Sequence, residues 1–270
     1  MLKRICFIIS LSTLSTIFTI SSSIKILKLG GGVITDKSAK IGVARKDVIG
    51  QIAKEISQYD GKIILVNGAG SFGHPLAKKY NLKNQFCIDG TIETHNSVRK
   101  LNQIIVNALI ENGVKAISVD PMSCIVCQGG RIESMQVDTI KEMIKNGFVP
   151  VLFGDMVMDT QKGACILSGD QIMTYLAKKL ETSILGFGSI ENGVYDENKR
   201  IIPKIDKENF KEIKKQIGES KFTDSTGGML GKVNELLETP DIVAYIFNAE
   251  QEGNITKFLN NGKVGTQITS

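Results

Sequence analysis

The sequence predicts an α/β fold with a mostly parallel central sheet covered by helices on both faces. Two observations lead to this prediction. Short apolar runs rich in Ile, Leu and Val alternate with longer segments in which apolar residues recur every three or four positions, a pattern typical of buried strands joined by amphipathic helices. Three of these runs, ending at Leu29, Val66 and Phe153, lead almost directly into glycines. Because ligands bind beyond the carboxyl ends of the strands in such sheets, the glycine turns mark the expected site.

The first half of the chain is expected to alternate strands with helices. Val48, Ile49, Ile52 and Ile56 share one helical face, and Asn112-Gly113 is a typical stop for a long helix. The expected strands lie at 24–29, 63–66, 116–119 and 149–153. The expected helices lie at about 48–56, 91–111 and 137–146, with a short one beyond His74.

The second half is expected to begin with a hairpin at 156–166, broken by the polar stretch 159–163. Ser168-Gly169-Asp170 then starts a helix that runs through Leu180. The remaining expected elements are a strand at 183–187, a loop at 188–196, a charged surface with a helix at 198–220, a helix from Thr226 to about Leu237, a strand at 242–247, and a last helix and strand.

The composition narrows the classes of partner. The 270 residues can bury a full core, as one domain or as two closely joined lobes. A net charge of +5 without long Lys or Arg runs does not indicate nucleic acid, and it fits anionic small molecules equally well. Five cysteines, an odd number, do not indicate a disulfide framework, so we expect a reducing compartment. Cys124 and Cys127 have redox spacing without a second pair, which favours a packing role.

Residues 1–23 differ from the rest of the chain. A basic start at Lys3-Arg4, an apolar stretch with many hydroxyl side chains, and Ser21-Ser22-Ser23 resemble a targeting segment, although an extension from an upstream start codon would have the same composition. The hydroxyls make this stretch a poor membrane span, so no stable membrane association is expected. We expect the fold to occupy residues 24–270 and the protein to be cytoplasmic.

The turn Gly68-Ala69-Gly70-Ser71-Phe72-Gly73-His74-Pro75 is the most informative stretch. Its glycines follow a buried strand and precede a helix, which leaves backbone N–H groups free at a helix start. With the helix dipole behind them, such groups bind phosphate or another anion. A second turn, Gly30-Gly31-Gly32, has Lys28 and Lys37 on its two sides. Two anion sites with fixed cations predict phosphoryl transfer.

These motifs, in this order, resemble the amino acid kinase family. The resemblance rests on Lys28-Leu29-Gly30-Gly31-Gly32 with Asp36-Lys37, on the turn at 68–75, on Ser168-Gly169-Asp170, and on Thr226-Gly227-Gly228-Met229 with Lys232. It covers the chain from residue 24 to the end, and His74 makes the chain similar to the isopentenyl phosphate kinases of that family. It implies an open αβα sandwich whose N-terminal half, to about residue 167, holds the acceptor and whose C-terminal half, from about residue 168, holds the nucleotide.

The same resemblance implies an activity and its partners. The γ-phosphoryl group of ATP, with Mg²⁺, would be transferred to isopentenyl phosphate, giving isopentenyl diphosphate for isoprenoid biosynthesis, and the protein would be a homodimer. The chemistry agrees independently, because a phosphate monoester is already an anion and needs no general base. The task is to align two repelling anions and to neutralise the transferred group.

The resemblance also implies roles for individual residues, with Asp170 orienting Lys28 and Lys232 through charge-assisted hydrogen bonds. The catalytic residues would be Lys28, Lys37, His74, Asp170 and Lys232. The nucleotide would contact Lys28, Leu29, Gly30, Gly31, Gly32, Ala69, Ser189, Gly228 and Lys232. The acceptor would contact Gly68, Gly73, His74, Asp155 and Gly169. No protein side chain is assigned as a metal ligand.

Several positions have a simpler interpretation beside the functional one. Asp155 follows a buried strand and would also serve as a turn former, and His95 would be structural or a wall of the pocket for the apolar tail. Ile190 and Asn192 stand where the family has carboxylates near the adenosine. Three alternatives stay open: a family member acting on a phosphonate such as fosfomycin, one acting on a carboxylate, and a non-catalytic nucleotide-binding regulator.

Overall fold

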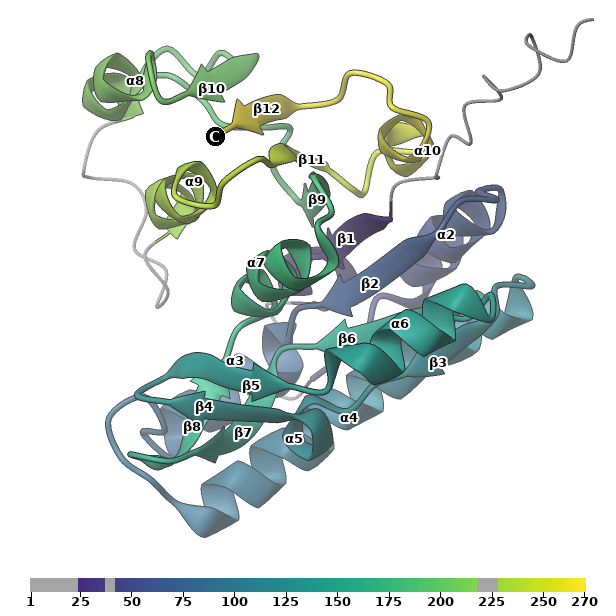
Figure 1. Cartoon of the computed structure of the whole chain (residues 1–270), viewed down its shortest axis with the longest axis vertical. Coiled ribbons are helices and arrows are strands. Elements are labelled where there is room, and N and C mark those ends of the chain that lie inside the picture. Colours follow the sequence, from purple (N-terminus) through teal and green to yellow (C-terminus); the bar gives the residue numbers. More distant parts are fainter. Residues whose placement is uncertain (1–23, 37–41, 218–227) are drawn as a thin grey trace, which may run out of the picture.

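The structure, a computed structural model, describes residues 24–36, 42–217 and 228–270. Its centre is an eight-stranded sheet (Figure 1). In spatial order the strands are β10 (Lys204–Asp206), β12 (Thr266–Thr269), β11 (Val243–Asn248), β9 (Ile184–Ser189), β1 (Lys25–Leu29), β2 (Ile63–Asn67), β6 (Val149–Phe153) and β3 (Ala116–Ser118). Neighbouring strands run parallel except for β11 and β12. The predicted mostly parallel sheet is confirmed.

Two apolar layers cover the two faces of this sheet. Since successive side chains of a strand point to opposite faces, Ile26 and its neighbour Leu27 belong to different layers. The layer around Ile26 includes buried residues of α6 (Val137–Lys145), α7 (Gly169–Leu180), α8 (Phe210–Ile217) and α9 (Gly228–Leu237). The layer around Leu27 includes those of α1 (Gly31–Ile34), α2 (Lys46–Ser57), α3 (Gly70–Lys79), α4 (Ile88–Glu111) and α10 (Asn254–Leu259). The αβα sandwich is therefore confirmed.

A second, four-stranded sheet lies beside α4 (Figure 1). Its strands, in order, are β5 (Arg131–Met135), β4 (Ile125–Gln128), β7 (Asp155–Asp159) and β8 (Gly163–Leu167), and α5 (Pro121–Cys124) precedes β4. The predicted hairpin is the pair β7 and β8, but β4 and β5 were not predicted. β4 has four residues and is apolar at three successive positions, and β5 is polar at three of its five positions, so neither is marked by an apolar run bounded by turn residues. Cys127 is buried within β4 as a free thiol, in keeping with the packing role.

Asp159 holds the tip of this second sheet together. Its carboxylate accepts hydrogen bonds from the backbone N–H groups of Gly129, Gly130, Gln161 and Lys162, at 2.6 to 3.1 Å. Burial works to raise the pKa of this carboxyl, but the four donors outweigh it and lower the pKa to about 2. The turn between β4 and β5 and the turn between β7 and β8 are thereby joined through one ionised side chain.

The helix starts differ in part from their predicted positions. Ser168 caps α7 as expected, since its hydroxyl accepts from Gln171 N. α4 begins at Ile88, three residues before the predicted start, and the Cys87 thiol accepts from Gly90 N there. The prediction of a short helix beyond His74 is wrong in its start, because α3 begins at Gly70 and continues through Pro75. Within the described residues, no helix has the length and apolar character needed to cross a bilayer.

A buried carboxylate joins α2 to α10 and so connects the two halves of the sandwich. Glu55 accepts hydrogen bonds from Gly253 N (3.0 Å), Thr256 N (2.9 Å) and Thr256 Oγ1 (3.0 Å) at the start of α10. Arg45 adds an ion pair with Glu250 close by. These contacts connect helices that are about 200 residues apart in the chain.

We expect Glu55→Gln to lower the free energy of unfolding by about 1–3 kcal/mol, because a charged acceptor of three donors becomes a neutral amide. Urea denaturation followed by circular dichroism measures the change. Glu111→Gln, at the exposed end of α4, is the matched control and should stay within about 0.5 kcal/mol of the wild type. Equal stabilities of the two variants would contradict the role given to Glu55.

Candidate functional site

The carboxyl ends of β1 and β2 bring the two glycine turns into backbone contact. A Cβ atom added to Gly31 would lie 2.4 Å from the N atom of Gly70, and one added to Gly68 would lie 2.6 Å from the N atom of Gly31. No side chain fits at such distances. At the end of β9, the O atom of Gly188 accepts a hydrogen bond from Gly30 N at 2.8 Å. The two turns and the end of β9, from distant parts of the sequence, therefore lie together at one edge of the sheet.

Thr35 joins the same two turns through its hydroxyl. The Oγ1 atom donates to Gly31 O at 2.6 Å and accepts from Ser71 N at 3.1 Å, and the residue is fully buried. Thr35 was not predicted from the sequence, because a threonine after a glycine turn carries no motif. Its role becomes visible only when α1 and α3 lie side by side.

Lys28 and Asp170 form an ion pair beside the glycine turns. Lys28 Nζ, at the end of β1, lies 2.5 Å from Asp170 Oδ1 in the first turn of α7, and both side chains are mostly buried. Burial favours the neutral form of Asp170, but Lys28 and Lys232 outweigh it and lower the pKa of this carboxyl. Lys232 Nζ also lies 5.6 Å from the centre of the Phe187 ring. The structure thus brings two of the predicted lysines to one carboxylate.

The backbone at Gly154, Gly169 and Ala69 meets close to this pair, since a Cβ atom on Gly169 would lie 3.4 Å from Cε of Lys28. A Cβ atom on Gly154 would lie 3.4 Å from Gly169 N and 3.8 Å from Ala69 N. Gly154 N donates to Asn67 O at 2.9 Å, and the buried Asn67 side chain accepts from Asn102 on α4 at 2.9 Å. The ends of β2 and β6 and the start of α7 therefore meet here. Asn67 was not predicted, although an asparagine ending an apolar run just before a glycine is a usable signal.

His74 lies inside α3 rather than at its start, and it is exposed. Exposure is what contact with a substrate requires. The preceding Gly73 packs against α4, since a Cβ atom there would lie 3.1 Å from Cγ1 of Val98. This contact fixes the distance between α3 and α4 next to His74.

Asp155 and His95 form a pair that the sequence analysis did not predict. The Asp155 carboxylate is fully buried and lies 2.9 Å from His95 Nδ1, while His95 Nε2 lies 3.9 Å from Asp120. Burial raises the pKa of Asp155 to about 6, although His95 and Met156 N act to lower it. His95, Asp120 and Asp155 are close enough to bind a metal ion together, because one potential ligand atom of each lies within 4.8 Å of the others. Arg99 Nε already contacts Asp120 at 3.0 Å.

The remaining predicted nucleotide residues lie around the end of β9 and in the adjacent helices. Ser189 ends β9, and its hydroxyl bonds with the backbone of Glu191 in both directions, at 3.0 Å each. Asn192, in the following loop, accepts from Asn248 Nδ2 at the end of β11 (3.0 Å). Leu29 is buried in β1, Gly32 lies in α1, and Gly228 opens α9. Lys37 lies outside the described residues, so its role stays a prediction.

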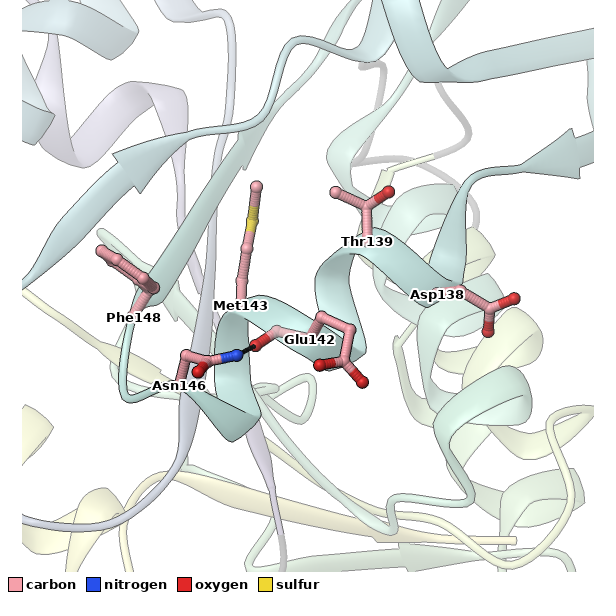
Figure 2. Close-up of a pocket in the computed structure, with 6 residues that line it drawn as sticks. All are labelled: Asp138, Thr139, Glu142, Met143, Asn146 and Phe148. Atoms are coloured by element: carbon pink, nitrogen blue, oxygen red, sulfur yellow. Dashed lines mark hydrogen bonds between the residues drawn. The ribbon is translucent and has the colours of Figure 1, made fainter.

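An open hollow of about 580 Å³ lies away from these turns, along α6 and the turn that follows it (Figure 2). Its lining residues are Asp138, Thr139, Glu142, Met143, Asn146 and Phe148. The acidic side chains at its rim already form ion pairs with Lys141 and Lys145. Size alone does not make this hollow a candidate site for anions, because its lining residues include neither a glycine nor a lysine, and two of them are acidic.

Comparison with known proteins identifies relatives over nearly the whole chain. The model of the amino acid kinase family matches residues 23–246. The isopentenyl phosphate kinase of Methanocaldococcus jannaschii is 34% identical over 263 residues, covering 90% of this chain and 97% of that protein. The enzyme of the same name from Methanothermobacter thermautotrophicus is 33% identical, with 90% and 98% covered. The acetylglutamate kinase of Campylobacter hominis is 24% identical.

Solved structures give the same result. A structure described as an X-ray structure of isopentenyl phosphate kinase matches with a TM-score of 0.78 and 30% identity, covering 91% of this chain and all of the other. A substrate complex of an isopentenyl phosphate kinase matches with a TM-score of 0.72 and 26% identity, covering 91% of this chain and 99% of the other. The similarity therefore extends over both halves of the sandwich.

The raised pKa of Asp155 predicts a pH dependence of stability. A carboxyl whose pKa is higher in the folded state, about 6 against an ordinary 3.8, stabilises the fold when protonated. This contribution is complete below pH 4 and is lost as the pH rises to about 6, by about 3 kcal/mol. The Asp155→Asn variant has no carboxyl at this position and therefore does not lose stability in this way. The unfolding free energy of the wild type minus that of the variant should therefore decrease as the pH rises from 4 to 7.

Urea denaturation at several pH values measures this difference. Asp159 and Asp170, whose pKa values are lowered, act in the opposite direction in both proteins and cancel in the comparison. A difference that stays constant with pH would contradict the assignment to Asp155.

Proposed function

We propose, since the chain belongs to the amino acid kinase family, that it transfers the γ-phosphoryl group of ATP to isopentenyl phosphate, giving isopentenyl diphosphate. The observation that carries the proposal is the contact between two glycine turns beside the Lys28–Asp170 pair. Backbone N–H groups at two helix starts and a fixed ammonium group meet there, which suits two phosphate-bearing molecules that must approach one another. Relatives that are more than 30% identical and carry this activity in their names support the choice of acceptor.

The residues around the turns have separate tasks in this reaction. The acceptor phosphate is already an anion, so direct in-line attack needs no general base. Lys28, oriented by Asp170, neutralises charge on the transferred group, and Lys232 approaches the nucleotide from the C-terminal half. We assign the acceptor to the half ending near residue 167, with Gly68, Gly73 and His74, and to Gly169 at the start of the other half. Asp155, whose carboxylate is not exposed, supports this side without contacting the acceptor. We assign the nucleotide to the half beginning near residue 168. Lys37 is assigned to the nucleotide phosphates from its motif alone.

Mg²⁺ fits this site through the nucleotide. It prefers oxygen ligands, keeps several waters and usually binds through substrate phosphates together with few carboxylates. Because Lys28 already occupies Oδ1 of Asp170, we assign the ion to the phosphates of ATP, where it supplies charge neutralisation. An ATP-dependent reaction also fits the cytoplasm, where ATP is abundant.

The direct test is a coupled assay of the full chain with ATP and Mg²⁺ against isopentenyl phosphate, dimethylallyl phosphate, fosfomycin and glutamate. We expect the highest kcat/KM with isopentenyl phosphate, because the site offers an anion cradle and an exposed histidine to a phosphorylated acceptor. Preference for fosfomycin or glutamate would replace the proposed acceptor. ATP binding without turnover of any of the four compounds would favour a nucleotide-binding regulator.

We expect His74→Ala to raise KM for isopentenyl phosphate by about 10- to 100-fold, the effect of losing one hydrogen bond to a charged group. KM for ATP should change little. Initial rates at varied concentrations of each substrate separate the two constants. Lys78→Ala, another exposed residue of α3, is the matched control. Equal weakening of both substrates in the His74 variant would remove His74 from the acceptor site.

A homodimer is our proposal for the assembly, formed across the free edge of the main sheet. β3 is the last strand of that sheet, and Ile117 on it is 38% exposed. Phe148, which immediately precedes the neighbouring strand β6, is 45% exposed and lines the hollow of Figure 2. Apolar edge strands tend to pair with another chain. Light scattering should give twice the mass of one chain, and Ile117→Lys should shift the population to monomers. A monomeric wild type would contradict this assembly.

A further inference from the structure

His95 ties α4 to the first residue of β7. Its Nδ1 atom lies 2.9 and 3.1 Å from the two oxygens of Asp155. The histidine side chain is 17% exposed and the carboxylate is not exposed at all. An ionised carboxylate can only accept, so Nδ1 carries the proton and donates. Removal of the imidazole would leave a buried carboxylate without its side-chain donor.

This tie lies directly beside the acceptor side of the proposed site. Asp155 follows Gly154, whose backbone packs against Gly169 N and Ala69 N and whose N–H group donates to Asn67 O. A shift of Asp155 therefore moves the turn that meets the starts of α3 and α7. On the same helix, one turn after His95, Val98 packs against Gly73, the residue before His74.

We propose that His95 is a positioning residue for the acceptor: by holding Asp155, it sets the distance between α4 and the turn at Gly154, and so the width of the acceptor side. This inference rests on the proposed function for the identity of the acceptor. His95 acts through Asp155 and the backbone, and it transfers no proton in the reaction. Together with the Gly73–Val98 contact, it holds α4 against both walls of the acceptor side.

Metal binding at His95, Asp120 and Asp155 is the competing interpretation, and the contacts that these side chains already make weigh against it. Arg99 already binds Asp120 at 3.0 Å, and His95 Nδ1 is committed to Asp155. The Asp120 oxygen that lies 3.9 Å from Nε2 is the one Arg99 contacts, and the other oxygen accepts from Met122 N at 3.2 Å. Nε2 is then the one uncommitted ligand atom of this cluster, fewer than a transition-metal site uses. A positioning role, unlike metal binding, requires no change in any of these contacts.

Three substitutions of His95 separate positioning from simple loss of stability. The amide of His95→Asn lies where Nδ1 does and can still donate to Asp155, whereas His95→Gln presents its amide near the position of Nε2, and His95→Ala has no donor. We expect KM for isopentenyl phosphate to rise about 10- to 100-fold in the Ala and Gln variants, with KM for ATP unchanged, and to return to near the wild-type value in the Asn variant. Asn96→Ala, the exposed neighbour on α4, is the matched control.

Amide hydrogen exchange of the substrate-free protein gives a second readout. The N–H groups of Gly154 and Phe72, both hydrogen-bonded in the acceptor-side turns, should exchange faster in the Gln and Ala variants and at the wild-type rate in the Asn variant. Unchanged exchange, or equal KM increases for both substrates, would overturn the proposal. So would Zn²⁺ or Mn²⁺ binding by the wild type that His95→Asn abolishes. If the wild type fails to turn over isopentenyl phosphate, the proposed function falls, while the exchange rates still decide the role of His95.

Discussion

The backbone contact between the two glycine turns is the constraint on which the rest of the structure depends. β1 and β2 are neighbouring parallel strands, so the turns that follow them must share one edge of the sheet. Gly31 and Gly70 approach so closely that no side chain fits between them, and the Thr35 hydroxyl bonds to both turns. The starts of α1 and α3 therefore behave as one unit, and their N–H groups keep a fixed spacing. Two phosphate-bearing ligands held there are held relative to each other as well.

The charges at this edge are fixed in the same manner. Burial by itself would favour the neutral form of Asp170, but Lys28 and Lys232 lower the pKa of this carboxyl and keep it ionised. The carboxylate in turn restrains the Lys28 ammonium group at 2.5 Å. A free lysine would lose side-chain entropy on meeting a phosphate, whereas a restrained one has lost it on folding. Fixed positive charge is what phosphoryl transfer needs most, because the reaction is a matter of alignment and charge stabilisation.

α4 connects this edge to the second sheet. Its middle and C-terminal parts pack on the main sheet through residues such as Leu101 and Ile105, and its N-terminal part lies along β7 (Figure 1). A single long helix therefore transmits the packing of the core to the acceptor side. The His95–Asp155 bond and the Gly73–Val98 contact lie on this helix, on either side of the position where we assign the acceptor. The stiffness of α4 limits how far the two sheets can separate there.

The family resemblance implied the grouping of Lys28, Asp170 and Lys232, and the sequence pattern by itself determined the α/β class, most of the strands and helices, and the glycine turns. These features leave local signals: strands buried on both faces are apolar runs, helices have a 3.6-residue period, and close backbone approach demands glycine. The short strands β4, β5 and β10, the start of α3 before His74, and the Thr35 bridge carried no such signal. Nor could the sequence choose between the two interpretations of Asp155. Only the tertiary structure decided that its partner is His95, 60 residues away, because a hydrogen bond between distant side chains depends on how α4 packs against β7 and leaves no pattern along the chain.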